Sequence, residues 1–517
     1  MSRQLLQSTA LVSGATLLSR ILGFVRDLLI ARYFGADALT DAFFVAFKIP
    51  NFMRRLFAEG AFSQVFVPVL TGYRAEGLEA TRNFLAKLSG VFLLLLALIT
   101  VLGVLLAPVL VGLFAPGLYV RADVFELTTL LLRITFPYLF FIALTAFAAG
   151  IQNAEGQFAL PALTPILLNL CLIAGCLWMA QTFEPPVMVL AVGVLVAGIV
   201  QWLVQIPALL RLGLLPRPRL DFTDPTVRRV GRLLWPALLG ASVQQINLLM
   251  NTLLASFLMS GSISWLYYSD RLLEFPLGVF GVALGTVILP HLAGCQSNPS
   301  AKSYSSTLDW ALRWIIIIGV PASLGLGLLA HPLMLTLFEG TEFTLTDADM
   351  AARSLMAYAP GLLGFMAVKV LTPAFSARQD MTNPAKVAGE VVLANLFLSV
   401  FFAIMLSPYG WGHAGLALAV SLAAWLNAIR LLGILIQSGA YRPGSGWWRF
   451  LLRVLLASVG MSLLLVHLAL PLPWVDESSY WRVGHLGLWI GLGVLTYLMG
   501  LLLTGLKPGH LIMTPRL

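Results

Sequence analysis

The stretch VFLLLLALITVLGVLLAPVLVGLF, residues 91–114, contains no charged side chain. A transmembrane helix needs about 20 consecutive apolar residues, because it must cross a hydrocarbon layer roughly 30 Å thick. Similar stretches recur along the 517 residues, of which 59% are hydrophobic and 11% are charged. About a quarter of a typical soluble protein is charged. The composition therefore excludes a soluble multidomain enzyme and indicates an integral membrane protein.

Fourteen apolar stretches are predicted to cross the membrane as helices. They lie near residues 10–34, 39–71, 84–114, 124–151, 158–181, 187–210, 229–260, 265–292, 308–337, 351–377, 385–406, 413–436, 448–470 and 483–506. With this count, the arginine-rich loops 211–232 and 430–453 lie on the side of the N-terminus, and loops on the opposite side hold acidic residues such as Glu339 and Asp476. Because positive loops stay in the cytoplasm, both termini are expected there.

Proline spacing suggests an internal duplication. Pro137 and Pro360 are 223 positions apart, and so are Pro161 and Pro384. The alternative is chance, because proline is common in membrane helices. Duplication predicts an all-α protein with an N-lobe at residues 1–215, a C-lobe at 216–440 and two further helices within 441–517, which lie outside the repeat.

The chain lacks the sequence motifs of several functional classes. The net charge of +9 comes without a basic run interleaved with aromatics, so nucleic acid is not an expected partner. Cys171, Cys176 and Cys295 form neither a disulfide framework nor a metal cluster and are expected to be packing residues. No Walker A, HExxH or GxSxG motif is present, so the chain is not expected to be an enzyme, and no metal or cofactor site is predicted.

Charged residues are concentrated in residues 1–90, and many of them fall inside the first two predicted spans. A charge near the bilayer centre costs roughly 2.5–3.5 kcal/mol on insertion scales, so such side chains face a bundle interior or water. Arg20, Arg26 and Arg54 are therefore predicted to line a polar cavity, and Pro50 is expected to kink the second span. The alternative is that these arginines only brace the bundle.

The eighth predicted span adds a second charged group. Asp270, Arg271 and Glu274 lie within one helical turn, and Ser264 is close in sequence. Arginine forks match phosphate oxygens bidentately, whereas a cation exporter would need unpaired carboxylates or aromatic cages. The arginines therefore favour an anionic, phosphorylated substrate.

Three motifs resemble those of a known family. SRILGFVRD at residues 19–27, TDAFFVAFKIPNFMRRLFAEGAFSQ at 40–64 and SDRLLEFPLGVFGVALGTVILP at 269–290 closely resemble the MurJ (MviN) family of lipid II flippases in the MOP exporter superfamily. The resemblance covers essentially the full length. It implies a V-shaped fold of two six-helix lobes, with two C-terminal helices that form a lipid-facing groove.

The resemblance also implies a function and a site. The family moves lipid II, the undecaprenyl-pyrophosphate-linked peptidoglycan precursor, from the cytoplasmic to the periplasmic leaflet of the bacterial inner membrane by alternating access. Its partners would be lipid II, membrane lipids and other cell-wall synthesis proteins. The family's substrate-binding positions fall on Arg20, Arg26, Arg54, Arg271, Asp41, Asn51, Ser264 and Glu274.

Three rival functions stay open from the sequence. The chain could export another polyprenyl-linked glycan, act as a MATE-like drug antiporter, or organise envelope synthesis as a scaffold. No cofactor is expected, and coupling to the membrane potential or to a monovalent cation is left open.

Overall fold

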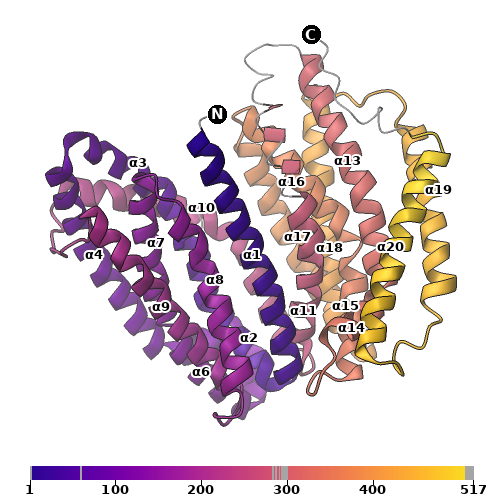
Figure 1. Ribbon diagram of the computed structural model, residues 1–517, viewed down its shortest axis with the longest axis horizontal. Helices are drawn as coiled ribbons and strands as arrows, with labels where there is room; N and C mark the ends of the chain where they lie inside the picture. Colours follow the sequence, from indigo (N-terminus) through magenta and orange to yellow (C-terminus); the bar gives the residue numbers. More distant parts are fainter. Residues whose placement is uncertain are drawn as a thin grey trace. The chain divides into compact units, whose positions relative to one another are not determined.

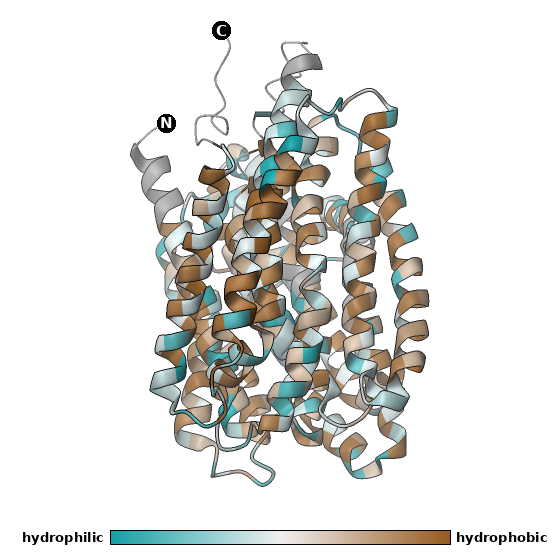
Figure 2. Ribbon diagram, turned by 90° about the vertical axis from the view of Figure 1, so that its right-hand side faces the viewer, coloured by the Kyte–Doolittle hydropathy of each residue, from teal (hydrophilic) through white to brown (hydrophobic). Residues whose placement is uncertain are grey.

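The computed structural model describes residues 3–58, 61–281, 284–285, 288–289, 291–292 and 301–506. Every regular element in these ranges is a helix, which confirms the predicted all-α class (Figure 1). Long hydrophobic stretches cover the helices, and hydrophilic residues occupy many of the turns that join them (Figure 2). The contacts divide the chain into two compact units, Met1–Ile263 and Ser264–Leu517.

The first unit contains twelve helical elements. They are α1 (Arg3–Phe34), α2 (Ala38–Ala58), α3 (Ala61–Glu76), α4 (Leu78–Leu105), α5 (Ala107–Phe114), η1 (Pro116–Val120), α6 (Ala122–Thr135), α7 (Tyr138–Ala154), α8 (Ala159–Ala174), η2 (Gly175–Met179), α9 (Met188–Leu212) and α10 (Pro225–Ser256). The expected lobe boundary at residue 215 precedes α10, whereas the contacts group α10 with this first unit.

The second unit begins within α11 (Ser262–Pro276). Its other elements are η3 (Leu277–Gly281), α13 (Ala301–Leu328), α14 (Ala330–Phe338), α15 (Leu345–Tyr358), α16 (Gly361–Ala377), α17 (Thr382–Leu406), η4 (Ser407–Tyr409), α18 (Gly412–Gln437), α19 (Trp447–Leu464), η5 (Leu465–Ala469) and α20 (Ser479–Leu503).

The repeated prolines occupy matching positions in the two units. Pro137 directly precedes α7 and Pro360 directly precedes α16, and both have φ of −61°. Pro161 and Pro384 are each the third residue of their helix, α8 and α17. Proline is favoured in a first turn, where its missing N–H has no helical partner to lose. The shared offset therefore reflects the same helix breaks in both units.

The core of the first unit is built from phenylalanine rings on α3, α4 and α7. The Phe62 ring stacks on Phe92 at 5.1 Å between centroids, and Phe66 stacks on Phe147 at 4.9 Å. Gly150 of α7 permits this approach, because a Cβ there would lie 2.6 Å from a ring carbon of Phe66. Stacked and tilted aromatic pairs add about 0.5–1.5 kcal/mol each beyond their burial.

Pro50 lies inside α2, as predicted. A proline has no N–H, so it leaves the carbonyl of the residue four positions earlier, Ala46, without its usual helical donor. The Thr135 hydroxyl of α6 donates to that carbonyl at 3.2 Å. In an apolar surrounding such freed carbonyls must find another donor. A neighbouring helix therefore satisfies the carbonyl that Pro50 leaves without a helical donor.

Nine helices in the described residues are long and apolar enough to span a membrane, or ten if the bent pair Leu345–Tyr358 and Gly361–Ala377 is one span. This supports a multi-pass membrane protein but does not confirm the predicted count of 14. The four remaining predicted spans, at residues 10–34, 39–71, 229–260 and 265–292, are not among these helices.

Candidate functional site

Arg26 is buried in the first unit, with 6% of its surface exposed. Its Nε and Nη2 donate to one oxygen of Asp27 at 2.9 and 2.6 Å. Its Nη1 donates to the side-chain oxygen of Asn169 on α8 at 3.0 Å, and the Asn169 amide donates in turn to the Ser19 carbonyl. This arrangement keeps a charged guanidinium in an apolar region, because the carboxylate and the amide replace the water it has lost.

Arg54 is oriented by a partner on its own helix. Its Nε donates to the side-chain oxygen of Asn51 at 2.8 Å, and both residues are half-buried on α2. Residues three apart lie on the same face of a helix, so this contact follows directly from the spacing. Arg20, by contrast, is exposed on α1.

Two further polar contacts join α2 to the end of α10 and the turn after it. Asp41, which is 4% exposed, accepts a hydrogen bond from the Gly261 backbone N–H at 2.8 Å. The Lys48 ammonium donates to the Thr252 hydroxyl at 2.9 Å. Asp41 thus has a structural contact within the first unit.

In the second unit, Arg271 lies between a carboxylate and an aromatic ring. Its Nη1 donates to Glu274 at 2.7 Å, and its Nη2 donates to the Tyr267 hydroxyl at 3.1 Å. The guanidinium carbon also lies 4.8 Å from the centroid of the Tyr267 ring. Arg271 is half-buried and Glu274 is exposed, whereas Ser264 is completely buried.

The structure therefore divides the eight predicted residues between the two units. Arg20, Arg26, Asp41, Asn51 and Arg54 belong to the first, and Ser264, Arg271 and Glu274 to the second. Arg26, Arg54 and Arg271 each have a polar partner that orients the guanidinium.

Two partners were not predicted as site residues. Asn169 is the only amide in the apolar helix α8, and a lone polar residue within a membrane span is itself a functional signal. Tyr267 precedes Arg271 by four residues, which places both on one helix face. Both signals are present in the sequence, but neither residue is among the positions that the family resemblance implied.

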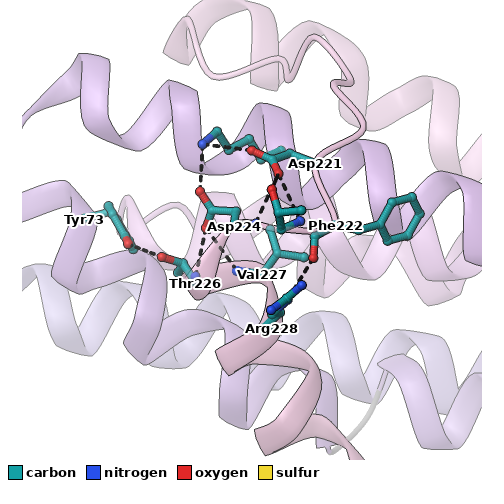
Figure 3. A network of polar contacts seen from close by, with 9 residues as sticks. Tyr73, Asp221, Phe222, Asp224, Thr226, Val227 and Arg228 are labelled. Carbon is teal, nitrogen blue, oxygen red and sulfur yellow. Dashed lines mark hydrogen bonds and ion pairs between the residues drawn. The ribbon is translucent and has the colours of Figure 1, made fainter.

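Polar contacts fix the loop 213–224 between α9 and α10, here called the strap, within the first unit (Figure 3). The Lys87 ammonium of α4 donates to Asp224 at 2.7 Å and forms an ion pair with Asp221 at 3.2 Å. The backbone N–H of Arg219 donates to the Ala86 carbonyl at 2.9 Å. A Cβ on Gly90 would lie 2.2 Å from the Arg219 carbonyl oxygen, so glycine is required for this close approach.

The strap carboxylates remain charged well below neutral pH. Hydrogen bonds from Thr223 and Lys87 hold the pKa of Asp221 below its usual value of 3.8. The Lys87 hydrogen bond does the same for the pKa of Asp224. A carboxylate whose pKa is lower in the folded than in the unfolded protein stabilises the folded form at any pH above its pKa in the unfolded protein. This stabilisation is lost as the pH falls through the pKa of the folded protein. Asp224 also accepts from the Thr226 N–H at 2.8 Å and so caps the start of α10.

Replacing Lys87 by methionine is expected to loosen the strap, because both of its carboxylates lose their cationic partner. Trypsin should then cleave after Arg219, which precedes Leu220, several-fold faster than in the parent protein, as measured by mass spectrometry on detergent-solubilised samples at neutral pH. Lys386→Met removes an exposed lysine of α17 and serves as the matched control. Equal cleavage rates in the two variants would show that Lys87 does not hold the strap.

An apolar hollow of about 270 Å³ lies between α13 and the α19–η5 segment in the second unit. Its lining comprises Leu324, Leu455, Ser458, Val459, Ser462, Leu463 and Val466. It belongs to the region in which the resemblance implied a lipid-facing groove. Its walls suit a hydrocarbon chain, since five of the seven lining residues are leucine or valine.

The family model described as lipid II flippase MurJ matches residues 30–484. A protein of Vibrio cholerae serotype O1 described as a probable lipid II flippase MurJ is 44% identical over 515 residues, which cover 98% of this chain and 97% of that protein.

Two solved structures are similar in fold. The inward closed conformation of a lipid II flippase MurJ aligns with a TM-score of 0.79 at 27% identity and covers 95% of this chain and 98% of its own. An inward-facing MATE family multidrug resistance transporter of the MOP superfamily aligns with a TM-score of 0.62 at 14% identity, over 83% of this chain and 98% of its own. The second likeness is one of fold alone.

Proposed function

Since the chain belongs to the MurJ family of lipid II flippases, we propose that it moves lipid II from the cytoplasmic to the periplasmic leaflet of the bacterial inner membrane. It is a transporter and not an enzyme. The relationship extends over 98% of the chain. The structural observation that supports this function best is the buried Arg26–Asp27 pair, because a charge placed in an apolar helix bundle is characteristic of a transport pathway.

The arginines supply the recognition chemistry. Guanidinium forks fit the oxygens of a pyrophosphate bidentately, and such charge-assisted bonds are roughly twice as strong as neutral ones. In our proposal Arg20, Arg26, Arg54 and Arg271 bind the pyrophosphate. Asn51 and Glu274 orient Arg54 and Arg271, while Asp41 and Ser264 brace the helices that carry them.

The carboxylates beside Arg26 and Arg271 act as counter-ions in this proposal. Without substrate, Asp27 and Glu274 serve as counter-ions and offset part of the cost of holding an arginine charge away from bulk water. When pyrophosphate binds, it competes with them for the same N–H donors. Each arginine would then be positioned before the substrate arrives.

The finer architecture is also part of the proposal. It comprises 14 spans with both termini in the cytoplasm, lobes at residues 1–215 and 216–440, and a C-terminal pair within 441–517 whose hollow takes the lipid chain. The lobes would alternate access by rocking. The strap, with exposed Arg217 and Arg219, would then lie on the cytoplasmic side, as the positive-inside rule requires.

The membrane potential is proposed to assist export, with no cofactor required. Moving about two negative charges outwards across an inside-negative membrane gains roughly 4.6 kcal/mol per 100 mV if the whole field is crossed. An uncoupler should therefore reduce surface exposure of lipid II. Flipping that continues unchanged after the potential collapses would remove the voltage step while leaving the substrate assignment in place.

Complementation tests the function in cells. In a strain depleted of its own lipid II flippase, this chain is expected to prevent lysis and to restore the pool of lipid II that an externally added lipid II-cleaving toxin can reach. The strain without the chain should lyse with lipid II trapped in the inner leaflet. Continued lysis with correctly inserted protein would refute the proposal.

A further inference from the structure

We propose that Asp309, Tyr497 and Arg482 are positioning residues, which fasten the C-terminal helix pair α19–α20 to α13–α14 and so set the hollow between α13 and α19. This inference rests on the proposed function, because the hollow is taken to seat the hydrocarbon chain of the substrate. The three contacts, here called latches, occur at the two ends and in the middle of the helix pair.

The first latch is centred on Asp309, near the start of α13. Its Oδ1 accepts hydrogen bonds from the Tyr441 hydroxyl at 2.9 Å, the Gly444 N–H at 3.0 Å and the Trp447 indole at 2.6 Å. Its Oδ2 accepts from Arg313 at 2.9 Å, and the Arg313 guanidinium lies 5.1 Å from the Trp447 ring centroid. One carboxylate thus fixes the loop that leads into α19 and the first residue of α19 itself.

The Tyr441 hydroxyl stays protonated in this latch. Burial and the neighbouring Asp309 carboxylate raise its pKa well above the usual value of 10. It therefore donates a hydrogen bond to Asp309 at neutral pH.

The second latch joins α20 to α13 one turn before Pro321. Pro321 lies inside α13 and has no N–H, so the carbonyl of Ile317 lacks its helical donor. The Tyr497 hydroxyl of α20 donates to this carbonyl at 2.9 Å, and the Tyr497 side chain is buried. Inside a membrane-embedded helix bundle no water is available to donate to the freed carbonyl, so the hydrogen bond from Tyr497 is favoured.

The third latch lies at the start of α20. Arg482, which is 7% exposed, forms an ion pair with Glu339 at the end of α14. Its Nε also donates to the Glu477 carbonyl at 2.8 Å. Removing one partner of a largely buried pair leaves the other charge uncompensated, so this latch is the strongest of the three by physical type.

The hollow lies between the second and third latches along the chain of α13–α14. Leu324, which forms its α13 wall, follows Ile317 and precedes Glu339. The other lining residues belong to α19 and η5. α19 and α20 also pack closely, since a Cβ on Gly500 would lie 2.9 Å from the Ala457 Cα. Holding α20 at both levels therefore holds α19 over α13.

Cross-linking across the hollow tests the latches. Leu324→Cys and Val459→Cys are introduced after Cys171, Cys176 and Cys295 are replaced by alanine, and a short bifunctional thiol reagent is applied to native membranes. Tyr497→Phe should lower the cross-linked fraction about threefold, the effect of losing one typical interhelical hydrogen bond in a membrane. Tyr497→Phe with Arg482→Gln should lower it by about tenfold or more. The matched control is Tyr480→Phe, since Tyr480 is a 93% exposed tyrosine of the same helix.

Rescue separates a positioning role from general damage. Arg482→Glu alone should reduce cross-linking and lipid II exposure together, and adding Glu339→Arg should restore both because the ion pair re-forms with its charges exchanged. Unchanged cross-linking in the Tyr497→Phe, Arg482→Gln double variant would overturn the inference, and so would full flipping despite lost cross-linking. Failure of the parent chain to expose lipid II would instead refute the proposed function, while the cross-linking series would still report on the latches.

Discussion

Arg26→Ala is expected to abolish lipid II flipping and to lower the free energy of unfolding by about 3–5 kcal/mol. The large stability loss follows from the structure, because Asp27 is 1% exposed and would lose the ion pair with Arg26. Asn169 would also lose the donor that reaches it from α1. Thermal unfolding in detergent, together with a lipid II exposure assay, measures both effects.

A paired variant separates the two roles of Arg26. In Arg26→Gln with Asp27→Asn both charges are removed together, so neither charge of this pair is left without the other and most of the stability should return. Flipping should stay lost, because two amides cannot bind pyrophosphate as a guanidinium does. If the paired variant flips lipid II at the parent rate, Arg26 only braces the bundle, which was the alternative left open by the sequence.

Arg271→Ala is expected to reduce flipping about thirtyfold or more while changing stability by less than about 1 kcal/mol. A charged contact to a desolvated anion costs about 2–5 kcal/mol when it is removed. The ion pair with Glu274 is by contrast substantially exposed, with side-chain exposures of 27% and 47%, and exposed pairs contribute little to stability. Initial rates of lipid II exposure and unfolding temperatures give the two quantities.

Arg271→Lys and Arg430→Ala are the controls for that prediction. Lysine keeps the charge but loses the planar fork, so it should recover only part of the rate. Arg430 forms an ion pair with Glu390 at 2.8 Å in the same unit, with both side chains 50% exposed, and lies outside the proposed site. Its alanine variant should flip at the parent rate. Equal losses at Arg271 and Arg430 would contradict a specific role for Arg271.

The helices and the location of the charges could be predicted from the sequence, because both depend on local composition. Apolar stretches of sufficient length specify membrane helices, and the shared offset between Pro137 and Pro360 predicted matching breaks that α7 and α16 display. The contact between Arg54 and Asn51 also follows from helical spacing.

Contacts between distant segments could not be predicted in the same way. Asn169 is 143 positions from Arg26, and Tyr497 is 180 positions from Ile317, and no local pattern specifies either pairing. Pro50 and Pro321 each predict a carbonyl without a helical donor. Only the packed structure shows that the hydroxyls of Thr135 and Tyr497 donate to these carbonyls. The strap was predicted as a positive loop, whereas the structure shows that its carboxylates bind Lys87.

Transport by the purified chain is the most direct test of the proposed function. Proteoliposomes would contain the chain and fluorescent lipid II, and a membrane-impermeant reductant would quench only the label in the outer leaflet. With the parent protein, the quenchable fraction should rise beyond the half expected for static lipid II, and Arg26→Gln with Asp27→Asn should leave it near half. A quenchable fraction that stays near half with correctly folded parent protein, with and without an imposed membrane potential, would contradict lipid II flipping by this chain.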